Sequence, residues 1–113
     1  MSMDSQTIVA PMTPSGVSAV AALRVSGAHV RDVVARLFGN ERLQKLKARE
    51  ACLGTARDPQ SGKLIDSLLY IFFEGPNSYT GEDVLELYPH GNPLIVRDLL
   101  QAIRGLDGVR LAE

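Results

Sequence analysis

The amino-acid sequence predicts an α+β fold in which two main helices pack on a mixed β-sheet. The run at residues 68–73, LLYIFF, has the apolar composition of a buried strand. Two other segments carry apolar residues at helical spacing, and the order of helical and extended segments along the chain is irregular. With 113 residues the chain can build one core, so residues 1–113 are expected to form a single domain.

The first third predicts two strands and a helix. Residues 7–12, TIVAPM, and 17–25, VSAVAALRV, are strand candidates separated by a loop that contains proline and glycine. A helical pattern follows, with Ser26 or Gly27 at its start and Gly39 at its end. The apolar positions of this helix are Val30, Val33, Val34, Leu37 and Phe38.

The middle of the chain predicts a β-hairpin. Residues 40–50 are mostly charged and suit at best a short surface helix. A weak strand at 51–58 and a stronger one at 64–73 are separated by DPQSGK, a run of turn-forming residues. The apolar run in the second strand is typical of a central strand covered on both faces.

Residues 82–88 are compatible with a strand or a helix, and the strand is favoured because Pro89 ends the segment soon after. A strand would place Glu82 and Glu86 on one face, with their Cα atoms about 13 Å apart. That distance is too large for two carboxylates that share acid–base chemistry.

The last helix is predicted to begin at Asn92, an N-cap residue, with Pro93 at its first position. Gly105 suits its end, and GVRLAE is predicted to form a closing strand. The apolar stripe of the helix consists of Val96, Leu99, Leu100 and Ile103.

Composition narrows the classes of function. The 12 basic and 13 acidic residues are scattered, so no large basic face for duplex nucleic acid or for a membrane surface is expected. The single cysteine, Cys52, cannot form an internal disulfide, which is typical of a reducing compartment, and a cytoplasmic location is expected. The sequence shows no signal peptide and no apolar run long enough to span a membrane.

The polar stretch at residues 76–92, PNSYTGEDVLELYPHGN, allows two interpretations. On the residues alone, a solvated strand face with a capped turn is the simpler one. The other is a recognition site, in which well-spaced carboxylates accept hydrogen bonds from a ligand with several N–H groups. No metal site is expected, because His90, His29 and Cys52 are far apart in sequence and a metal needs three or four donors.

Familiar catalytic motifs are missing from the sequence. SGKL at residues 61–64 resembles the end of a phosphate-binding loop, but Arg57 stands where the first glycine is needed and Leu64 where Ser or Thr would hold magnesium. There is no Gly-x-Gly-x-x-Gly, Cys-x-x-Cys or Gly-x-Ser-x-Gly. This chain is therefore expected to have no catalytic residues and no nucleotide-hydrolysing activity of its own.

The sequence resembles the N-terminal domain of the tRNA modification GTPases called MnmE or TrmE. The resemblance covers nearly the whole chain and stops at Glu113, where the family continues into a helical domain and a GTPase domain, so the chain is expected to be an excised or truncated N-terminal domain. The segments that carry it are TIVAPMTPSG, LRVSG, VVARLFG, GKLIDSLLYIFFEGPNSYTGEDVLEL and HGNPLIVRDLLQAI.

The resemblance implies a function as well as a fold. The fold would be similar to the folate-binding domains of the glycine cleavage aminomethyltransferase. The domain would form a homodimer and bind 5-formyltetrahydrofolate or a related reduced folate as the one-carbon carrier. The full-length family modifies the wobble uridine of tRNA with an FAD-binding partner of the GidA or MnmG type. Contact with tRNA is through that full complex, whereas GTP, magnesium and potassium belong to the absent GTPase domain.

The resemblance also implies a set of folate-binding residues. Glu82 and Glu86 are candidates to accept hydrogen bonds from the pterin ring, and Tyr79 and Tyr88 are candidates to stack on it. The full set is Arg24, Asn77, Ser78, Tyr79, Thr80, Glu82, Glu86, Tyr88 and His90.

One departure from the family supports an alternative function. The family has Gly-Arg-Gly-Gly before its second strand, whereas this chain has Gly16-Val17-Ser18-Ala19 and so lacks a cation and two glycines there. The alternative is a purely structural dimerisation or partner-docking domain that has lost folate binding.

Overall fold

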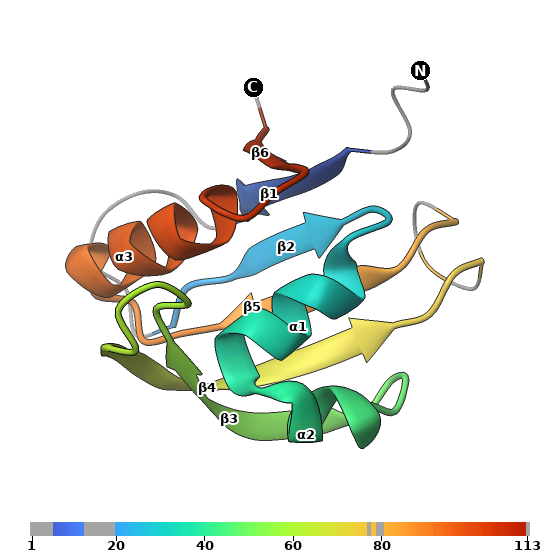
Figure 1. Ribbon diagram of the computed structural model, residues 1–113, viewed down its shortest axis with the longest axis horizontal. Coiled ribbons are helices and arrows are strands. Elements are labelled where there is room, and N and C mark those ends of the chain that lie inside the picture. Colours follow the sequence, from blue (N-terminus) through green and yellow to red (C-terminus); the bar gives the residue numbers. More distant parts are fainter. Residues whose placement is uncertain (1–5, 13–19, 77, 79–80, 113) are drawn as a thin grey trace.

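The computed structural model describes residues 6–12, 20–76, 78 and 81–112. Within these residues one sheet has the spatial order β3-β4-β5-β2-β1-β6 (Figure 1). Its strands are β1 (Thr7–Pro11), β2 (Leu23–Ser26), β3 (Ala51–Arg57), β4 (Leu64–Phe73), β5 (Val84–Tyr88) and β6 (Val109–Leu111). The helices are α1 (Val30–Phe38), α2 (Asn40–Gln44) and α3 (Pro93–Arg104).

The sheet is mixed. Four neighbouring pairs, β3–β4, β4–β5, β5–β2 and β2–β1, are antiparallel. The closing strand β6 runs parallel to β1. The predicted α+β class, the hairpin at its centre and the closing strand are therefore confirmed.

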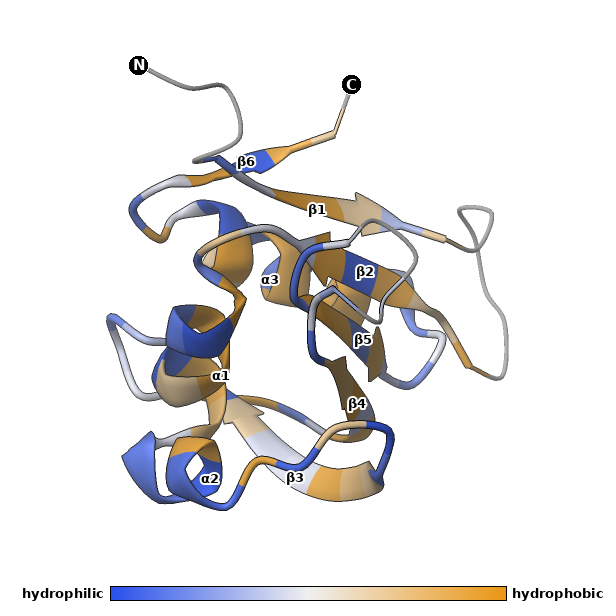
Figure 2. Cartoon of the chain, turned by 90° about the vertical axis from the view of Figure 1, so that its right-hand side faces the viewer, coloured by the Kyte–Doolittle hydropathy of each residue, from blue (hydrophilic) through white to orange (hydrophobic). Residues whose placement is uncertain are grey.

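The helices lie on one face of the sheet, as the edge-on view in Figure 2 shows. On β5, Leu85 and Leu87 point into the core between sheet and helices, where they join Val25 and Leu23 of β2. From α1 and α3, Val33, Leu37, Leu99 and Ile103 fill the same core. Each fully buried side chain of this size contributes about 1.5–3 kcal/mol through the area it removes from water.

The expectation that both faces of β4 are covered was wrong. Tyr70 and Phe72 are buried against the helices, but on the opposite face of the strand Leu69 is 48% exposed and Ser67 is also exposed. The apolar run arises because the second face of β4 also carries apolar side chains, although no described helix covers it. We call this second side, which carries Leu53, Leu69, Arg24, Glu86 and Tyr88, the open face.

Both main helices occur where the sequence predicts them, with one correction at a boundary. The N-cap of α1 is His29 rather than Ser26 or Gly27. Ser26 is still part of β2, and the Gly27 N–H donates to the Asp83 carbonyl, so this backbone belongs to the sheet. At α3 the expectation is confirmed, because the Asn92 side chain accepts from the Leu94 N–H at 2.8 Å and Gly105 follows the last turn.

Two other boundaries differ from the predicted ones. The second strand, expected at 17–25, is observed at Leu23–Ser26, and residues 17–19 lie outside the described residues. The segment at 82–88 is a strand, as favoured, but it begins at Val84. Glu82 precedes the strand, so strand alternation does not place it beside Glu86.

An aromatic stack joins α1 to the hairpin. The rings of Phe38 and Tyr70 are stacked with centroids 4.4 Å apart. They lie over Gly54 of β3, where an added Cβ would be 2.7 Å from the Tyr70 ring and 2.9 Å from the Phe38 ring. A residue without a side chain is therefore required beneath the stack.

Burial at this stack raises the pKa of the Tyr70 hydroxyl, and the neighbouring Cys52 thiol adds to the effect. A raised pKa means that the folded protein keeps this proton while the unfolded chain loses it above about pH 10. The contribution of the Tyr70 hydroxyl to the stability of the fold is thus constant below about pH 10. It is lost as the pH rises from there toward the pKa of Tyr70 in the folded protein.

We expect Tyr70→Phe to reduce the alkaline sensitivity of the fold. Urea unfolding of both proteins from neutral pH to about pH 11 should show a constant difference in the free energy of unfolding at neutral pH. Above about pH 10, where the unfolded tyrosine ionises, the unmodified protein should lose stability relative to Tyr70→Phe. A constant difference over that whole range would contradict the assignment of this proton to Tyr70.

Candidate functional site

The candidate site is centred on Glu86, a carboxylate in the middle of the open face. Arg24 lies directly opposite Glu86 in the β2–β5 register. The Arg24 Nη2 donates to Glu86 Oε2 at 3.4 Å, and the Tyr88 hydroxyl donates to Glu86 Oε1. Glu86 is only 7% exposed, so these two donors replace much of the water that a carboxylate requires.

Apolar side chains border this polar cluster on one side. In the β4–β5 register, Ile71 lies opposite Glu86 and Leu69 lies opposite Tyr88. The surface therefore combines hydrogen-bonding groups with adjacent apolar side chains, which suits a ligand whose ring system has polar edges.

His90 lies beyond the end of β5 and is held by Asp66 of β4. The His90 backbone N–H donates to Asp66 Oδ2 at 2.9 Å, and its ring Nδ1 is 2.9 Å from Asp66 Oδ1. An isolated antiparallel bridge pairs Val20 with His90. This bridge continues the register of β2 and β5, so His90 extends the row of Glu86 and Tyr88.

The loop between β4 and β5 is tied to α1 by Arg31. The Arg31 Nη2 donates to Glu74 Oε2 at 2.8 Å, and the Arg31 Nε donates to Asp83 Oδ2 at 3.3 Å. The other oxygen of Asp83 accepts from the Gly75 N–H at 3.0 Å, so this carboxylate joins the two ends of the loop. The Arg31 guanidinium also lies 4.8 Å from the centroid of the Phe72 ring.

A small cleft of about 300 Å³ lies between this loop and the start of α1. Glu82 lines it, and within the loop the Ser78 hydroxyl donates to the Glu82 carbonyl. The other lining residues are Gly27, Ala28, Gly75, Gly81 and Asp83.

The structure brings together only part of the predicted site. Arg24, Glu86 and Tyr88 form one cluster, and His90 continues their row. Ser78 and Glu82 belong to the separate loop region. Asn77, Tyr79 and Thr80 lie outside the described residues.

Sequence reasoning missed two residues that organise the site. Asp66 interrupts an otherwise apolar run of inward-facing positions on β4, and a buried acid in such a pattern signals a specific partner. Arg31 lies on the exposed side of α1, where one arginine among several shows no distinguishing pattern. Its role depends on how closely α1 approaches the loop in space.

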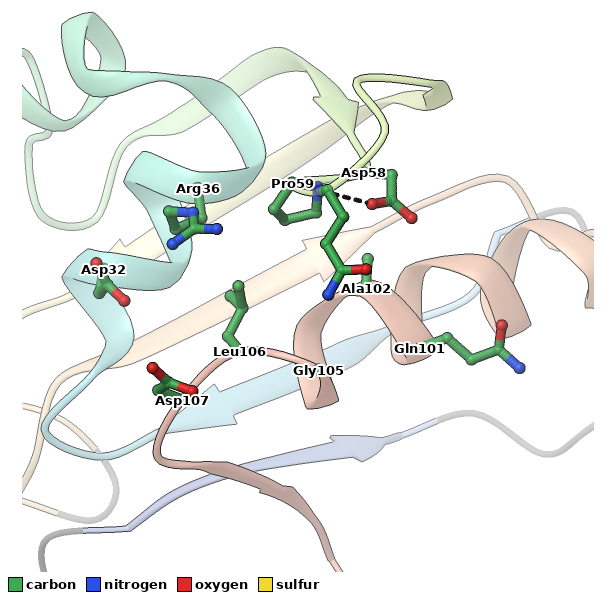
Figure 3. A pocket seen from close by; sticks show the side chains of 10 residues that line it. Asp32, Arg36, Asp58, Pro59, Gln101, Ala102, Gly105, Leu106 and Asp107 are labelled. Carbon is green, nitrogen blue, oxygen red and sulfur yellow. Dashed lines mark hydrogen bonds between the residues drawn. The ribbon is translucent and has the colours of Figure 1, made fainter.

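A larger groove of about 440 Å³ lies on the opposite side of the molecule, between α1, α3 and the β3–β4 turn (Figure 3). Asp32, Asp58 and Asp107 make it mainly acidic, with Arg36 on the α1 wall. None of the predicted folate-binding residues that the structure describes lines it.

The described residues contain neither a candidate metal-binding group nor a candidate membrane-spanning helix. No three His, Cys, Asp or Glu side chains within 6–12, 20–76, 78 and 81–112 are grouped so that they could hold a metal ion. None of the helices in the same part of the chain has the length and apolar character needed to cross a membrane.

Comparisons with known proteins point to a single family. The model of the family described as "GTP-binding protein TrmE N-terminus" matches residues 7–113. A tRNA modification GTPase MnmE of Buchnera aphidicola subsp. Baizongia pistaciae is 40% identical over 112 residues, which are 99% of this chain and 24% of the relative.

Further relatives carry the same name. The tRNA modification GTPase MnmE of Baumannia cicadellinicola is 41% identical over 112 residues, which are 99% of this chain and 23% of the relative. That of Shewanella amazonensis is 42% identical over 110 residues, which are 97% of this chain and 23% of the relative. The chain thus spans about a quarter of the length of these curated relatives.

We expect Arg31→Gln to loosen the loop without unfolding the domain. Because an exposed ion pair is worth at most about 1 kcal/mol, hydrogen exchange at the Gly75 and Gly27 amides should accelerate roughly two- to fivefold. Arg97→Gln, which removes an arginine paired with Asp98 on α3, is the control and should leave both amides unchanged. Unaltered exchange in the Arg31 variant would show that other contacts hold the loop.

Proposed function

Because this chain belongs to the family of GTP-binding protein TrmE N-terminal domains, we propose that it is a reduced-folate-binding and dimerisation module of a tRNA-modifying GTPase. The observation that carries the proposal is the Glu86 cluster on the open face, at the centre of a partly apolar surface.

The chemistry of Glu86 fits one edge of a pterin. A carboxylate has about four lone-pair positions, and Arg24 and Tyr88 use one on each oxygen. The remaining positions can accept from the exocyclic amino group and an adjacent ring N–H of a pterin, which present parallel donors. The low exposure of Glu86 strengthens such bonds because little water competes for them.

Three residues near Glu86 would complete the recognition. The Tyr88 ring and the adjacent Leu69 offer apolar surface to the flat face of the ligand. The Arg24 guanidinium would hold the Glu86 carboxylate in place through its contact with Oε2. Recognition is therefore assigned to the strands, which are more rigid than loops.

Dimerisation is supported by the apolar part of the open face. Leu53 of β3 and Leu69 of β4 lie directly opposite each other and are 63% and 48% exposed. Contiguous exposed apolar surface of this kind is typical of protein interfaces. A second copy of the chain would cover it, and a stable dimer needs about 800 Å² from each partner.

The two functions would be linked if the folate site adjoins the dimer interface. Glu86 and Leu69 lie on neighbouring strands and share the open face. A ligand that binds only the dimer stabilises the dimer by mass action, so folate would lower the dimer dissociation constant.

Activities of the longer relatives would come from segments beyond this domain. In this proposal, GTP hydrolysis, the FAD-binding partner and tRNA contact belong to the complete protein and its complex in the cytoplasm. The domain itself supplies the bound one-carbon carrier and the constitutive contact between two copies.

Calorimetric titration with 5-formyltetrahydrofolate tests folate binding. We expect saturation near one folate per subunit, and Glu86→Gln should weaken binding about tenfold or more because it removes a charged acceptor from paired N–H donors. Glu41→Gln, on the surface of α2, is the matched control. A folded dimer that takes up no folate would support the purely structural alternative.

Light scattering of Leu69→Lys tests the dimer interface. A charged group at this position would have to be buried when a second copy covers the open face, so we expect a monomer where the unmodified chain is a dimer. Leu94→Lys, which places the same change on an exposed leucine of α3, should remain dimeric. If Leu69→Lys has the mass of a dimer, as Leu94→Lys is expected to have, the dimer interface does not lie on the open face.

A further inference from the structure

The pairing of Asp66 with His90 has a chemical consequence for the proposed site. We propose that Asp66 is a positioning residue that holds His90 with its proton on Nδ1, so that Nε2 is an unprotonated acceptor for an N–H group of the bound folate. This inference rests on the proposed folate binding and deepens it, because it assigns a second acceptor to the same ligand.

The hydrogen bonds determine which ring nitrogen carries the proton. Asp66 is 8% exposed, and a carboxylate offers only acceptors. The His90 backbone N–H occupies Oδ2 at 2.9 Å, and Nδ1 lies 2.9 Å from Oδ1 and 3.1 Å from Oδ2. A stable contact at these distances requires a hydrogen on Nδ1, which in a neutral imidazole leaves Nε2 without one.

Despite these contacts, most of the His90 side chain is open to solvent. The His90 side chain is 67% exposed although its Nδ1 is held by a buried group. The ring is therefore fixed at one end and open to a ligand at the other. An imidazole oriented by a carboxylate in this way is a better-defined acceptor than a freely rotating surface histidine.

The position of His90 fits a ligand that extends from Glu86. Ala21 donates its N–H to the Pro89 carbonyl at 3.0 Å, and Val20 pairs with His90. The β5 row therefore continues beyond Tyr88, with the Glu86 and His90 Cα atoms about 13 Å apart at strand spacing. With its pterin edge on Glu86, a folate directed along this row would bring the N–H groups of its aminobenzoyl-glutamate part toward His90.

Asp66→Asn provides a near-isosteric test. Asparagine offers one acceptor and one donor group, so its Oδ1 can still accept from the His90 backbone while its Nδ2 donates to Nδ1. The imidazole proton should then move to Nε2 and convert the acceptor into a donor. The expected result is an exchanged pair of ¹⁵N shifts for His90 at about pH 8, together with folate affinity reduced about tenfold.

Two companion variants keep the test decisive. His90→Gln removes the ring but retains the backbone bond to Asp66, and it should also weaken folate binding about tenfold. Asp98→Asn, the same substitution on an exposed α3 residue, should change neither the His90 shifts nor the affinity. If Asp66→Asn does not fold, His90→Gln alone decides whether this ring contacts the ligand.

Failure of the inference differs from failure of the proposed function. The inference is overturned if the unmodified protein carries the His90 proton on Nε2, or if His90→Gln binds folate as tightly as the unmodified protein while Glu86→Gln does not. It is also overturned if Asp66→Asn exchanges the shifts and leaves the affinity unchanged. No folate binding by the unmodified protein would overturn the proposed function and this inference together.

Discussion

The structure depends on one constraint, which is that the described helices cover a single face of the sheet. Successive side chains of a strand point to opposite faces, so each strand contributes one row to the core and one to the open face. On β5 this places Leu85 and Leu87 in the core and Glu86 and Tyr88 on the open face. Stability and recognition are thus assigned to alternate residues of the same strand.

Side-chain contacts hold β5 at three places, which are its centre at Glu86 and the chain segments at its two ends. Arg24 and Tyr88 hold Glu86 between paired strands. At one end of β5, Asp83 and Arg31 join the loop to α1, and at the other end Asp66 holds His90. Both ends use a carboxylate that accepts from a backbone N–H as well as from a side chain, so each tie positions the chain and a functional group at once.

The elements of the fold were largely predictable because their signals are local. Asn92 and Pro93 predicted the start of α3, the spacing of apolar residues predicted α1, and a run of turn-forming residues predicted the hairpin. The covering of β4 was not predictable, because an apolar run is the same whether its second face meets a helix or another copy of the chain. The strand order also depends on long-range pairing that local patterns do not specify.

The candidate site was predicted less completely, for physical reasons. Glu86, Tyr88 and Arg24 were identified through the family resemblance, but their mutual contacts follow from the β2–β5 register. Glu82 was grouped with Glu86 by extending strand alternation two residues too far. Asp66 is 24 residues from His90 in sequence, and no spacing rule relates them before the sheet forms.

The most direct test of the open face as the functional face is to map amide chemical shifts while 5-formyltetrahydrofolate is added to the ¹⁵N-labelled domain. We expect saturable shifts at β2 and β5, centred on Arg24, Glu86 and Tyr88, with little change on the helical side. Shifts confined to the groove between α1, α3 and the β3–β4 turn, around Arg36 and Gln101, would contradict it (Figure 3).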